Sequence, residues 1–225
     1  MSANLKRVQV NNMSVKLLSI VAFVLTTALP SRALEPTSTT SGTINGHDYV
    51  DLGLSVKWAT CNVGADSPEE YGDYYAWGET STKSSYTKEN SKTYGKNIGD
   101  IKGNSYYDVA RANWGGKWRM PTKKEIQELK EKCTWTWTAI GSHSGYKVIG
   151  PSGKSIFLPA AGLRDKSLKY ANERGYYLSS TPCKNHDNNY ESAYFLDISI
   201  LYSEKSYVSD HLCRYLGFSI RPVIK

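Results

Sequence analysis

One segment of the chain has the complete pattern of an α-helix, and its isolation restricts the fold more than any other feature of the sequence. The segment 122–132 opens with a capping box formed by Thr122 and Glu125. Ile126 and Leu129 then lie on one apolar face of the predicted helix. A globular chain with so little helix must build most of its core from strands.

The rest of the apolar sequence falls into short runs that have β propensity. The turn residues 150–153 separate two such runs and predict a hairpin over 146–158. A short helix is expected at 106–113, and the polar stretch 78–103 is expected to be a long surface loop. Together these elements predict an α+β domain. The other strands are predicted at 49–52, 56–58, 74–77, 176–179, 193–200 and 218–224.

The N-terminus has the parts of a secretory signal peptide. Basic residues precede an apolar run at 17–29, and Ser31-Arg32-Ala33 supplies the small residues that a signal peptidase reads. The apolar run is about 13 residues long, whereas a membrane-spanning helix needs roughly 20, so an uncleaved anchor is the weaker alternative. We therefore expect a signal peptide at 1–33, a polar linker at 34–43 and one domain at 44–225. The protein is expected to be exported to the periplasm, the outer surface or the medium.

The positive charge of the chain belongs largely to this signal segment. The 28 Lys and Arg residues against 21 Asp and Glu give a net charge of +7. Residues 1–33 hold four basic and no acidic residues, so 24 basic residues face 21 acidic ones after cleavage, a net charge of +3. So small a charge without a basic run argues against nucleic acid as a partner. No stable membrane span is expected after cleavage.

Four cysteines remain in the exported part: Cys61, Cys133, Cys183 and Cys213. Their even number favours disulfides, and four cysteines allow three pairings. We expect Cys61 to pair with Cys133 and Cys183 with Cys213, and buried free thiols are the alternative. Neither these cysteines nor the four histidines have the spacing of a zinc site, so no metal is expected.

Two glycine-rich strings imitate catalytic or nucleotide-binding motifs without completing them. The string 150–155 ends in Gly-Lys-Ser, but Val148 stands where a phosphate-binding loop needs its first glycine. In 141–145, His143 takes the central place that a serine hydrolase gives to its nucleophile. The sequence therefore predicts neither a phosphate loop nor a serine hydrolase.

Seven strings of the chain form a familiar series. They are, in order, NGHDYVDLGLSVKWATCNVGA (45–65), YGDYYAWGET (71–80), WGGKWRMPTKKEIQEL (114–129), CTWTW (133–137), SIFLPAAGLR (155–164), GYYLSST (175–181) and GFSIRPV (217–223). The series resembles the Fibrobacter succinogenes major paralogous domain family, which is abundant in exported proteins of Bacteroidetes. The resemblance implies a C-type-lectin-like fold, in which a small twisted antiparallel sheet has few helices, adjacent terminal strands and long ligand-binding loops. It also implies a relation to the C-terminal domain of Legionella collagen-like proteins and to formylglycine-generating enzymes.

The resemblance suggests two functions, oxidase activity and calcium-dependent sugar binding, but the sequence lacks the motifs of both. The related oxidases need a pair of reactive cysteines, and no local pattern here matches one. The Glu-Pro-Asn and Trp-Asn-Asp triplets of calcium-dependent lectins are absent, although 185–189 offers oxygen ligands for calcium in one loop. We expect a solvated turn there, and neither a catalytic residue nor a cofactor.

The late loops, 185–191 and 202–214, combine Tyr with small polar residues, which is the composition of recognition surfaces. Some lectin-like relatives bind ligand with loops of this region, and ordinary surface loops are the alternative. Trp135 and Trp137 face one side of a predicted strand, either as core or as a binding platform, and we expect at least one in the core. The candidate ligand-binding residues are Asn185, His186, Asp187, Asn188, Asn189, Tyr190, Tyr202, Tyr207, Asp210 and His211.

These observations predict an exported, non-catalytic module that recognises a surface glycan or a protein through the late loops. One alternative is a structural or assembly component of the cell envelope that has no small ligand. A more remote alternative is an oxidase-like enzyme, which would need a cluster of reactive groups in a pocket.

Overall fold

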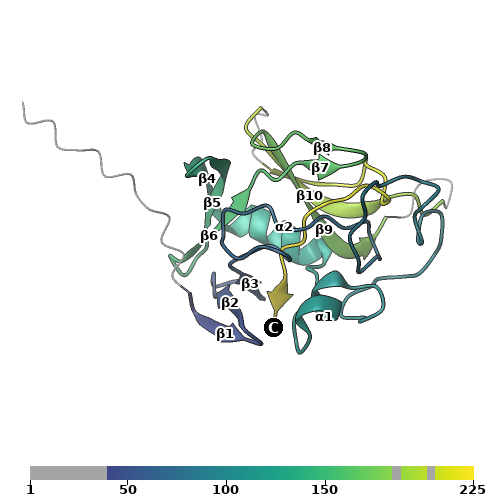
Figure 1. Ribbon diagram of the computed structural model, residues 1–225. Coiled ribbons are helices and arrows are strands. Elements are labelled where there is room, and N and C mark those ends of the chain that lie inside the picture. Colours follow the sequence, from purple (N-terminus) through teal and green to yellow (C-terminus); the bar gives the residue numbers. More distant parts are fainter. Residues whose placement is uncertain (1–39, 184–188, 202–205) are drawn as a thin grey trace, which may run out of the picture. The chain divides into compact units, whose positions relative to one another are not determined.

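The computed structural model describes residues 40–183, 189–201 and 206–225, which carry two helices and twelve strands (Figure 1). The helices are α1 (Val109–Trp114) and α2 (Lys123–Lys132). Neither helix of this described part is long and apolar enough to cross a membrane. The strands are β1 (Gly42–Ile44), β2 (His47–Val50), β3 (Lys57–Ala59), β4 (Thr134–Ile140), β5 (His143–Ile149), β6 (Ser155–Pro159), β7 (Leu163–Arg164), β8 (Leu168–Lys169), β9 (Arg174–Pro182), β10 (Ala193–Ser199), β11 (Ser206–Ser209) and β12 (Val223–Ile224).

The strands form antiparallel sheets whose order brings the first and last strands together. The first sheet has the order β1-β2-β3-β12, the second β4-β5-β6 and the third β11-β10-β9, while β7 and β8 form a two-stranded ribbon. Val223 of β12 pairs with Trp58 of β3, so the C-terminal strand lies against the early ones (Figure 1). Antiparallel sheets with two short helices make this an α+β fold, as the sequence predicted.

Both predicted helices are present. Thr122 Oγ1 accepts a hydrogen bond from the Glu125 amide at 3.3 Å, and the Glu125 carboxylate accepts one from the Thr122 amide at 2.8 Å, which completes the capping box of α2. Helix α1 begins later than predicted because Asp108 is its N-cap and accepts from the Arg111 amide at 3.1 Å. It ends before Gly115, whose φ of 66° a residue with a side chain rarely adopts.

The predicted hairpin is present and a third strand extends it. Strands β5 and β6 pair across the predicted turn, with Tyr146 opposite Leu158. Strand β4 lies on the other side of β5 and places Trp135 opposite Val148. Trp135 is 8% exposed, whereas Trp137 is half-buried, which confirms that at least one of the two tryptophans belongs to the core.

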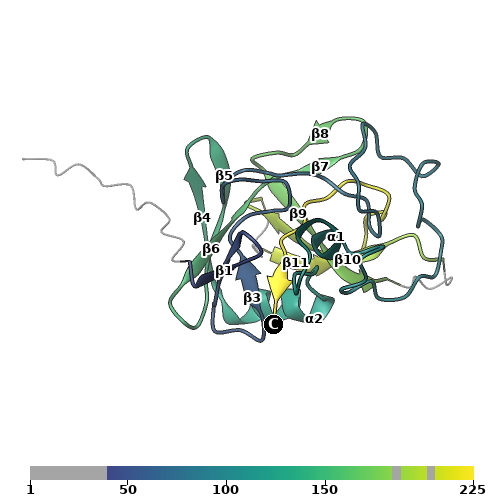
Figure 2. The same ribbon diagram turned by 60° about the horizontal axis from the view of Figure 1, so that its bottom comes forward.

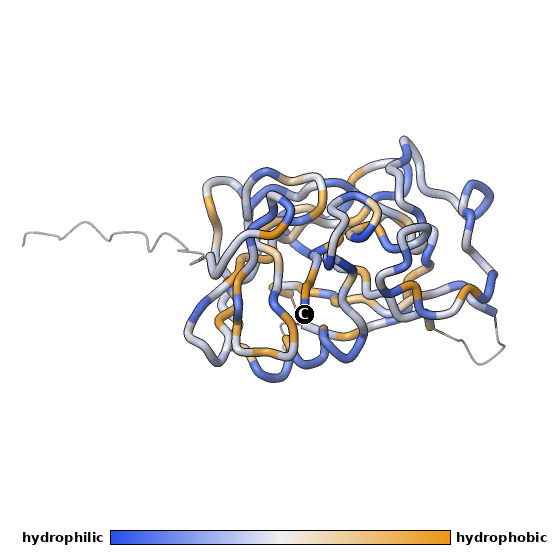
Figure 3. The backbone as a smooth tube through the Cα atoms, turned by 90° about the horizontal axis from the view of Figure 1, so that it is seen from below, coloured by the Kyte–Doolittle hydropathy of each residue, from blue (hydrophilic) through white to orange (hydrophobic). Residues whose placement is uncertain are grey.

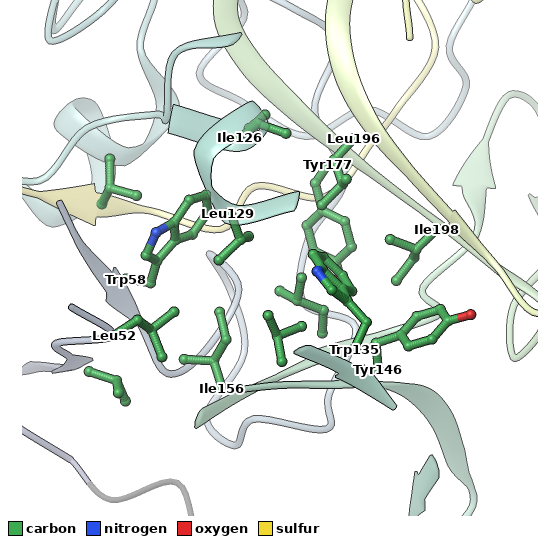
Figure 4. Close-up of a cluster of buried hydrophobic side chains, with 14 of the residues drawn as sticks. Leu52, Trp58, Ile126, Leu129, Trp135, Tyr146, Ile156, Tyr177, Leu196 and Ile198 are labelled. Carbon is green, nitrogen blue, oxygen red and sulfur yellow. The ribbon is translucent and has the colours of Figure 1, made fainter. Parts of the chain in front are cut away.

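Helix α2 packs its apolar face into the main hydrophobic core (Figure 4). Leu129 and Ile126 are buried there among side chains from the first, second and third sheets. Trp58 of β3 and Tyr177 of β9 belong to the same cluster, so one core joins all three sheets. Full burial of such side chains stabilises the fold by roughly 1.5–3 kcal/mol each.

The stretch 78–103 has no helix or strand, as predicted, but it is more than a surface loop. Tyr86 and Thr93 are buried, and the Tyr86 amide donates to the Asp165 carbonyl at 2.8 Å. Single buried side chains at irregular spacing anchor this loop, so no periodic signal reveals them in the sequence. The residues between them are polar, and Figure 3 shows mostly hydrophilic loops at the right-hand end, where Figure 1 places this stretch. We refer to residues 78–103 as the long loop.

The predicted disulfides do not form. All four cysteines lie within the described residues, and no disulfide joins Cys61 to Cys133 or Cys183 to Cys213, so both predicted pairings are wrong. Cys133 packs against the main core at the C-cap of α2, and the Cys183 thiol donates to the Asp210 carboxylate at 3.0 Å. An even number of cysteines does not by itself bring two Cα atoms within the roughly 4.4–6.8 Å that a disulfide needs.

The packing of α2 gives a first prediction. We expect Leu129→Ala to lower the free energy of unfolding by about 2–5 kcal/mol, because it leaves a cavity in the main core. Gln127→Ala, at an exposed position of the same helix, should change it by less than about 0.5 kcal/mol. Urea unfolding followed by tryptophan fluorescence measures both values. Equal losses in the two variants would contradict the packing described for α2.

Glu125 makes the stability of the protein depend on pH. Burial raises the pKa of this carboxyl, but hydrogen bonds from the Arg119 guanidinium at 2.8 and 2.6 Å and from the Thr122 amide outweigh burial, and the pKa lies below its usual value. A carboxylate with a lowered pKa stabilises the fold above its unfolded-state pKa of about 4.3, and this contribution is lost as the pH falls through the folded-state pKa. We expect Glu125→Gln to flatten the loss of stability on acidification below about pH 5.

Urea unfolding at a series of pH values measures this slope. Glu131→Gln, at an exposed position of the same helix, is the control and should keep the wild-type slope. If Glu125→Gln also kept the wild-type slope, the Arg119 pair would not be a source of acid sensitivity.

Candidate functional site

The structure describes five of the ten candidate ligand-binding residues. The other five lie outside the described residues: Asn185, His186, Asp187, Asn188 and Tyr202. The five that it places are Asn189, Tyr190, Tyr207, Asp210 and His211.

Four of these five residues meet at one edge of the third sheet. Strand β10 runs antiparallel between β9 and β11, so the end of β9, the start of β10 and the end of β11 lie together. Asn189 and Tyr190 come shortly before β10, and Asp210 and His211 come directly after β11. We call residues 189–192 and 210–214 the late edge. Tyr207 lies within β11 and is therefore farther from this edge.

Local hydrogen bonds hold the side chains of the late edge. The Asp210 carboxylate accepts from the Cys183 thiol at 3.0 Å, and the Ser209 hydroxyl lies 2.5 Å from Nδ1 of His211. Burial, followed by the hydrogen bond to Asp210, raises the pKa of Cys183 to about 11, so this thiol is protonated at neutral pH. The amide oxygen of Asn189 is buried, and no donor in the described part of the chain bonds to it. The late edge therefore contains an acceptor that the described residues leave unsatisfied.

A buried arginine connects the late edge to the long loop. Arg214 is 1% exposed, and its guanidinium donates to the Ser192 carbonyl at 2.9 Å. It also donates to the carbonyls of Thr93 and Lys96, at 3.4 and 3.2 Å. The same group lies over the ring of Trp77, 4.3 Å from its centroid. Burial lowers the pKa of Arg214 to about 10, which leaves the side chain charged at neutral pH.

The segment 92–98 of the long loop lies between the late edge and a pocket. The Gly95 amide donates to the Tyr190 carbonyl at 3.0 Å, which fixes this segment beside the late edge. Figures 1 and 2 both show the long loop at the same end of the third sheet as the start of β10. The pocket has a volume of about 450 Å³, within the range of about 300–1,000 Å³ that is usual for small-molecule sites. It is lined by Gly78, Glu79, Thr80, Lys92, Thr93, Lys96, Ile98, Ser105, Tyr106 and Tyr107.

The charges of the pocket lining do not balance. Glu79 is 3% exposed, pairs with the Lys83 ammonium at 2.6 Å and accepts from the Lys92 amide at 2.8 Å. Lys92 and Lys96 are exposed, and among the described residues no ion pair joins either ammonium group to a carboxylate. The carboxylate of the lining is thus neutralised while its two lysines are not, and the pocket carries net positive charge.

Sequence reasoning did not find this pocket, because its lining comes from loop residues without regular spacing. The available signal was the pair Lys92 and Lys96 followed by the adjacent Tyr106 and Tyr107, in a stretch otherwise rich in small polar residues. Only the folded chain brings these two groups of residues to one pocket.

The two described histidines outside the late edge lie in different sheets. His47 stacks on Trp114 at a ring separation of 3.8 Å, and burial lowers its pKa. His143 lies edge-on to Tyr71 at 5.0 Å, in a different sheet. No group of three or more His, Cys, Asp or Glu side chains in the described ranges could hold a metal ion. Four of the five residues of the oxygen-rich run 185–189 lie outside those ranges.

No protein-family model, curated protein or solved structure matches the chain. A fold class alone does not determine function, so function has to be argued from the site. Its parts are the late edge, the buried Arg214 and the basic pocket.

The role of Arg214 can be tested directly. We expect Arg214→Met to lower the free energy of unfolding by about 3 kcal/mol, because it leaves buried carbonyls without donors. Amide exchange in a peptide covering 92–98 should become faster, since this segment loses its tie to the late edge. Hydrogen exchange read by mass spectrometry measures this, with the exposed Lys117→Met as the control. An unchanged exchange rate would mean that other contacts hold the segment.

Proposed function

We propose that the protein is an exported, non-catalytic binding module with a C-type-lectin-like fold, which recognises a glycan or protein ligand through the late loops. The observation that carries this proposal is the convergence of candidate residues at the late edge, where Asn189 and Tyr190 meet Asp210 and His211. Tyrosine and small polar side chains on loops give contact area and hydrogen bonding at low cost in side-chain entropy.

The resemblance to the Fibrobacter succinogenes major paralogous domain family supports the lectin-like part of the proposal. Folds of this kind place the terminal strands side by side and leave long loops for the ligand. In this chain β12 pairs with β3, and the long loop lies beside the late edge. Both features agree with what the resemblance implies.

The chemistry of the thiols favours binding over oxidation. An oxidase related to formylglycine-generating enzymes would need a pair of reactive cysteines, and reactivity requires the thiolate. Burial raises the pKa of Cys133 to about 11, and burial together with Asp210 raises that of Cys183 to about 11. Burial also raises the pKa of Cys213. Thiols of this kind hold little thiolate at neutral pH.

Export rests on the signal-like segment 1–33, whose apolar run of about 13 residues is short for a membrane span. An exported domain behind a short linker also suits a structural or assembly component of the envelope. The two functions differ in one measurable respect, which is whether the late loops capture a ligand.

We expect the protein to capture a ligand on a glycan array or in a pull-down from cell surfaces. Combined alanine substitutions at Asn188, Tyr190, Tyr202 and Tyr207 should weaken capture at least about tenfold, which corresponds to about 1.4 kcal/mol. Tyr170→Ala, an exposed tyrosine at the end of β8, is the control and should keep the wild-type affinity.

Loss of capture at an unchanged melting temperature would support the proposal. A blank array and a blank pull-down with folded protein would overturn it in favour of the structural component. Capture that survives all four substitutions would also overturn it, because the ligand would then be held elsewhere.

A further inference from the structure

The pocket beside the late edge has a chemical character that defines a ligand class. We propose that this pocket binds an acidic saccharide, with a sugar carboxylate on Lys92 and Lys96 and a sugar ring against Tyr106. The inference rests on the proposed function, since it specifies the ligand of the same binding face. It adds a site that lies outside the late loops, on the long loop and the turn before α1.

The unbalanced charge of the lining indicates an anionic ligand. Glu79 cannot serve as the partner of the exposed lysines, because its carboxylate is buried and bonded to the Lys83 ammonium and the Lys92 amide. A ligand carboxylate placed between Lys92 and Lys96 would form charge-assisted hydrogen bonds with both. Repulsion between such a carboxylate and Glu79 is weakened, because the Lys83 ammonium 2.6 Å away offsets the charge of Glu79.

The aromatic and hydroxyl groups of the lining indicate a sugar rather than a simple anion. Tyr106 is 75% exposed, and its ring meets that of Tyr107 edge-on, with 4.7 Å between centroids. An exposed ring held by a neighbouring ring presents a flat apolar face, against which the C–H groups of a saccharide can pack. Thr80 and Ser105 add hydroxyl groups at the wall, which suit the many hydroxyls of a sugar.

The backbone beneath these side chains is held in place before any ligand arrives. The buried Thr93 hydroxyl donates to the Trp77 carbonyl at 2.6 Å, and the Arg214 guanidinium binds the carbonyls of Thr93 and Lys96. Gly78 has a φ of 73°, and a Cβ there would stand 2.9 Å from the Thr93 methyl group, so the floor is closely packed. A site that is already ordered loses less entropy when it binds.

The charge and the lining of the pocket favour an acidic saccharide over a nucleic acid or an acidic peptide as its ligand. A nucleic acid would need a broad basic surface, whereas the mature chain has a net charge of +3 and two uncompensated lysines in a pocket of about 450 Å³. An acidic peptide would satisfy the lysines but has no need of a wall of hydroxyls. The peptide is therefore kept as an arm of the experiment.

The experiment is isothermal titration calorimetry of the protein with an oligogalacturonate of a few residues. The methyl ester of the same oligosaccharide keeps the rings and removes the charge, and an oligoaspartate keeps the charge and removes the rings. We expect binding of the oligogalacturonate that weakens as salt is raised, with at least about tenfold weaker binding of the ester and of the oligoaspartate.

Substitutions in the pocket lining test whether the oligogalacturonate binds there. We expect the double variant Lys92→Ala with Lys96→Ala to bind the oligogalacturonate at least about tenfold more weakly. The matched control, Lys117→Ala with Lys225→Ala, removes the same charge from exposed positions outside the pocket and should bind like the wild type. Tyr106→Ala should weaken binding, whereas Tyr106→Phe, which keeps the ring, should not.

Equal binding of the ester, equal or tighter binding of the oligoaspartate, or unchanged affinity in the Lys92 and Lys96 double variant would each overturn the proposal. Because all the substituted side chains are exposed, far-ultraviolet circular dichroism should show a wild-type fold for every variant. If no oligogalacturonate binds while the late loops still capture another glycan or a protein, this inference fails and the proposed function stands. If neither binds anything, both fail.

Discussion

The C-terminal segment 217–224 runs between the first and third sheets, and its backbone hydrogen bonds join them. The Ser219 amide donates to the Tyr176 carbonyl of β9 at 3.0 Å and the Ser219 carbonyl accepts from the Leu178 amide at 3.1 Å, while Val223 of β12 pairs with Trp58 in the first sheet. Every residue of the segment is buried. Small sheets need a hydrophobic face packed against another element to be stable. This segment joins the first sheet to the third, at one end of which the late edge lies.

Two buried arginines fix irregular segments of the chain by donating hydrogen bonds to their carbonyl groups. Arg221 is 1% exposed and donates to Oδ1 of Asn62 at 2.8 Å and to the Ala59 carbonyl at 3.1 Å. Arg214 does the same for carbonyls of the long loop and for Ser192 of the late edge. Loop carbonyls that are buried need donors, and a guanidinium offers five in a fixed geometry. Loops of this chain can therefore be both irregular and well packed.

The parts of the fold that were predictable from the sequence are those with a local signal. The capping box at Thr122 marked the start of α2, and the turn at 150–153 marked the hairpin of β5 and β6. Burial of Tyr86 in the long loop was not predictable, because a single anchor has no period. The disulfides were predicted from the even number of cysteines and the expected export of the protein. Neither gives the distance between two cysteines in the folded chain. The pocket could not be predicted, because its lysines and tyrosines are separated in the sequence and only the folded loop brings them to one pocket.

Near the late edge and the pocket, the path of the backbone and the exposed surface depend on different atoms of the same residues. At Lys96 the carbonyl is bonded to Arg214 while the side chain is exposed at the pocket. At Tyr190 the carbonyl accepts from Gly95, so the backbone is fixed whatever side chain stands there. Since the loop path is set by backbone carbonyls and buried groups, exchanging an exposed side chain changes the surface without changing the path. For the proposed binding function, this separation means that the exposed side chains can change the ligand without changing the fold, because stability and binding depend on separate groups.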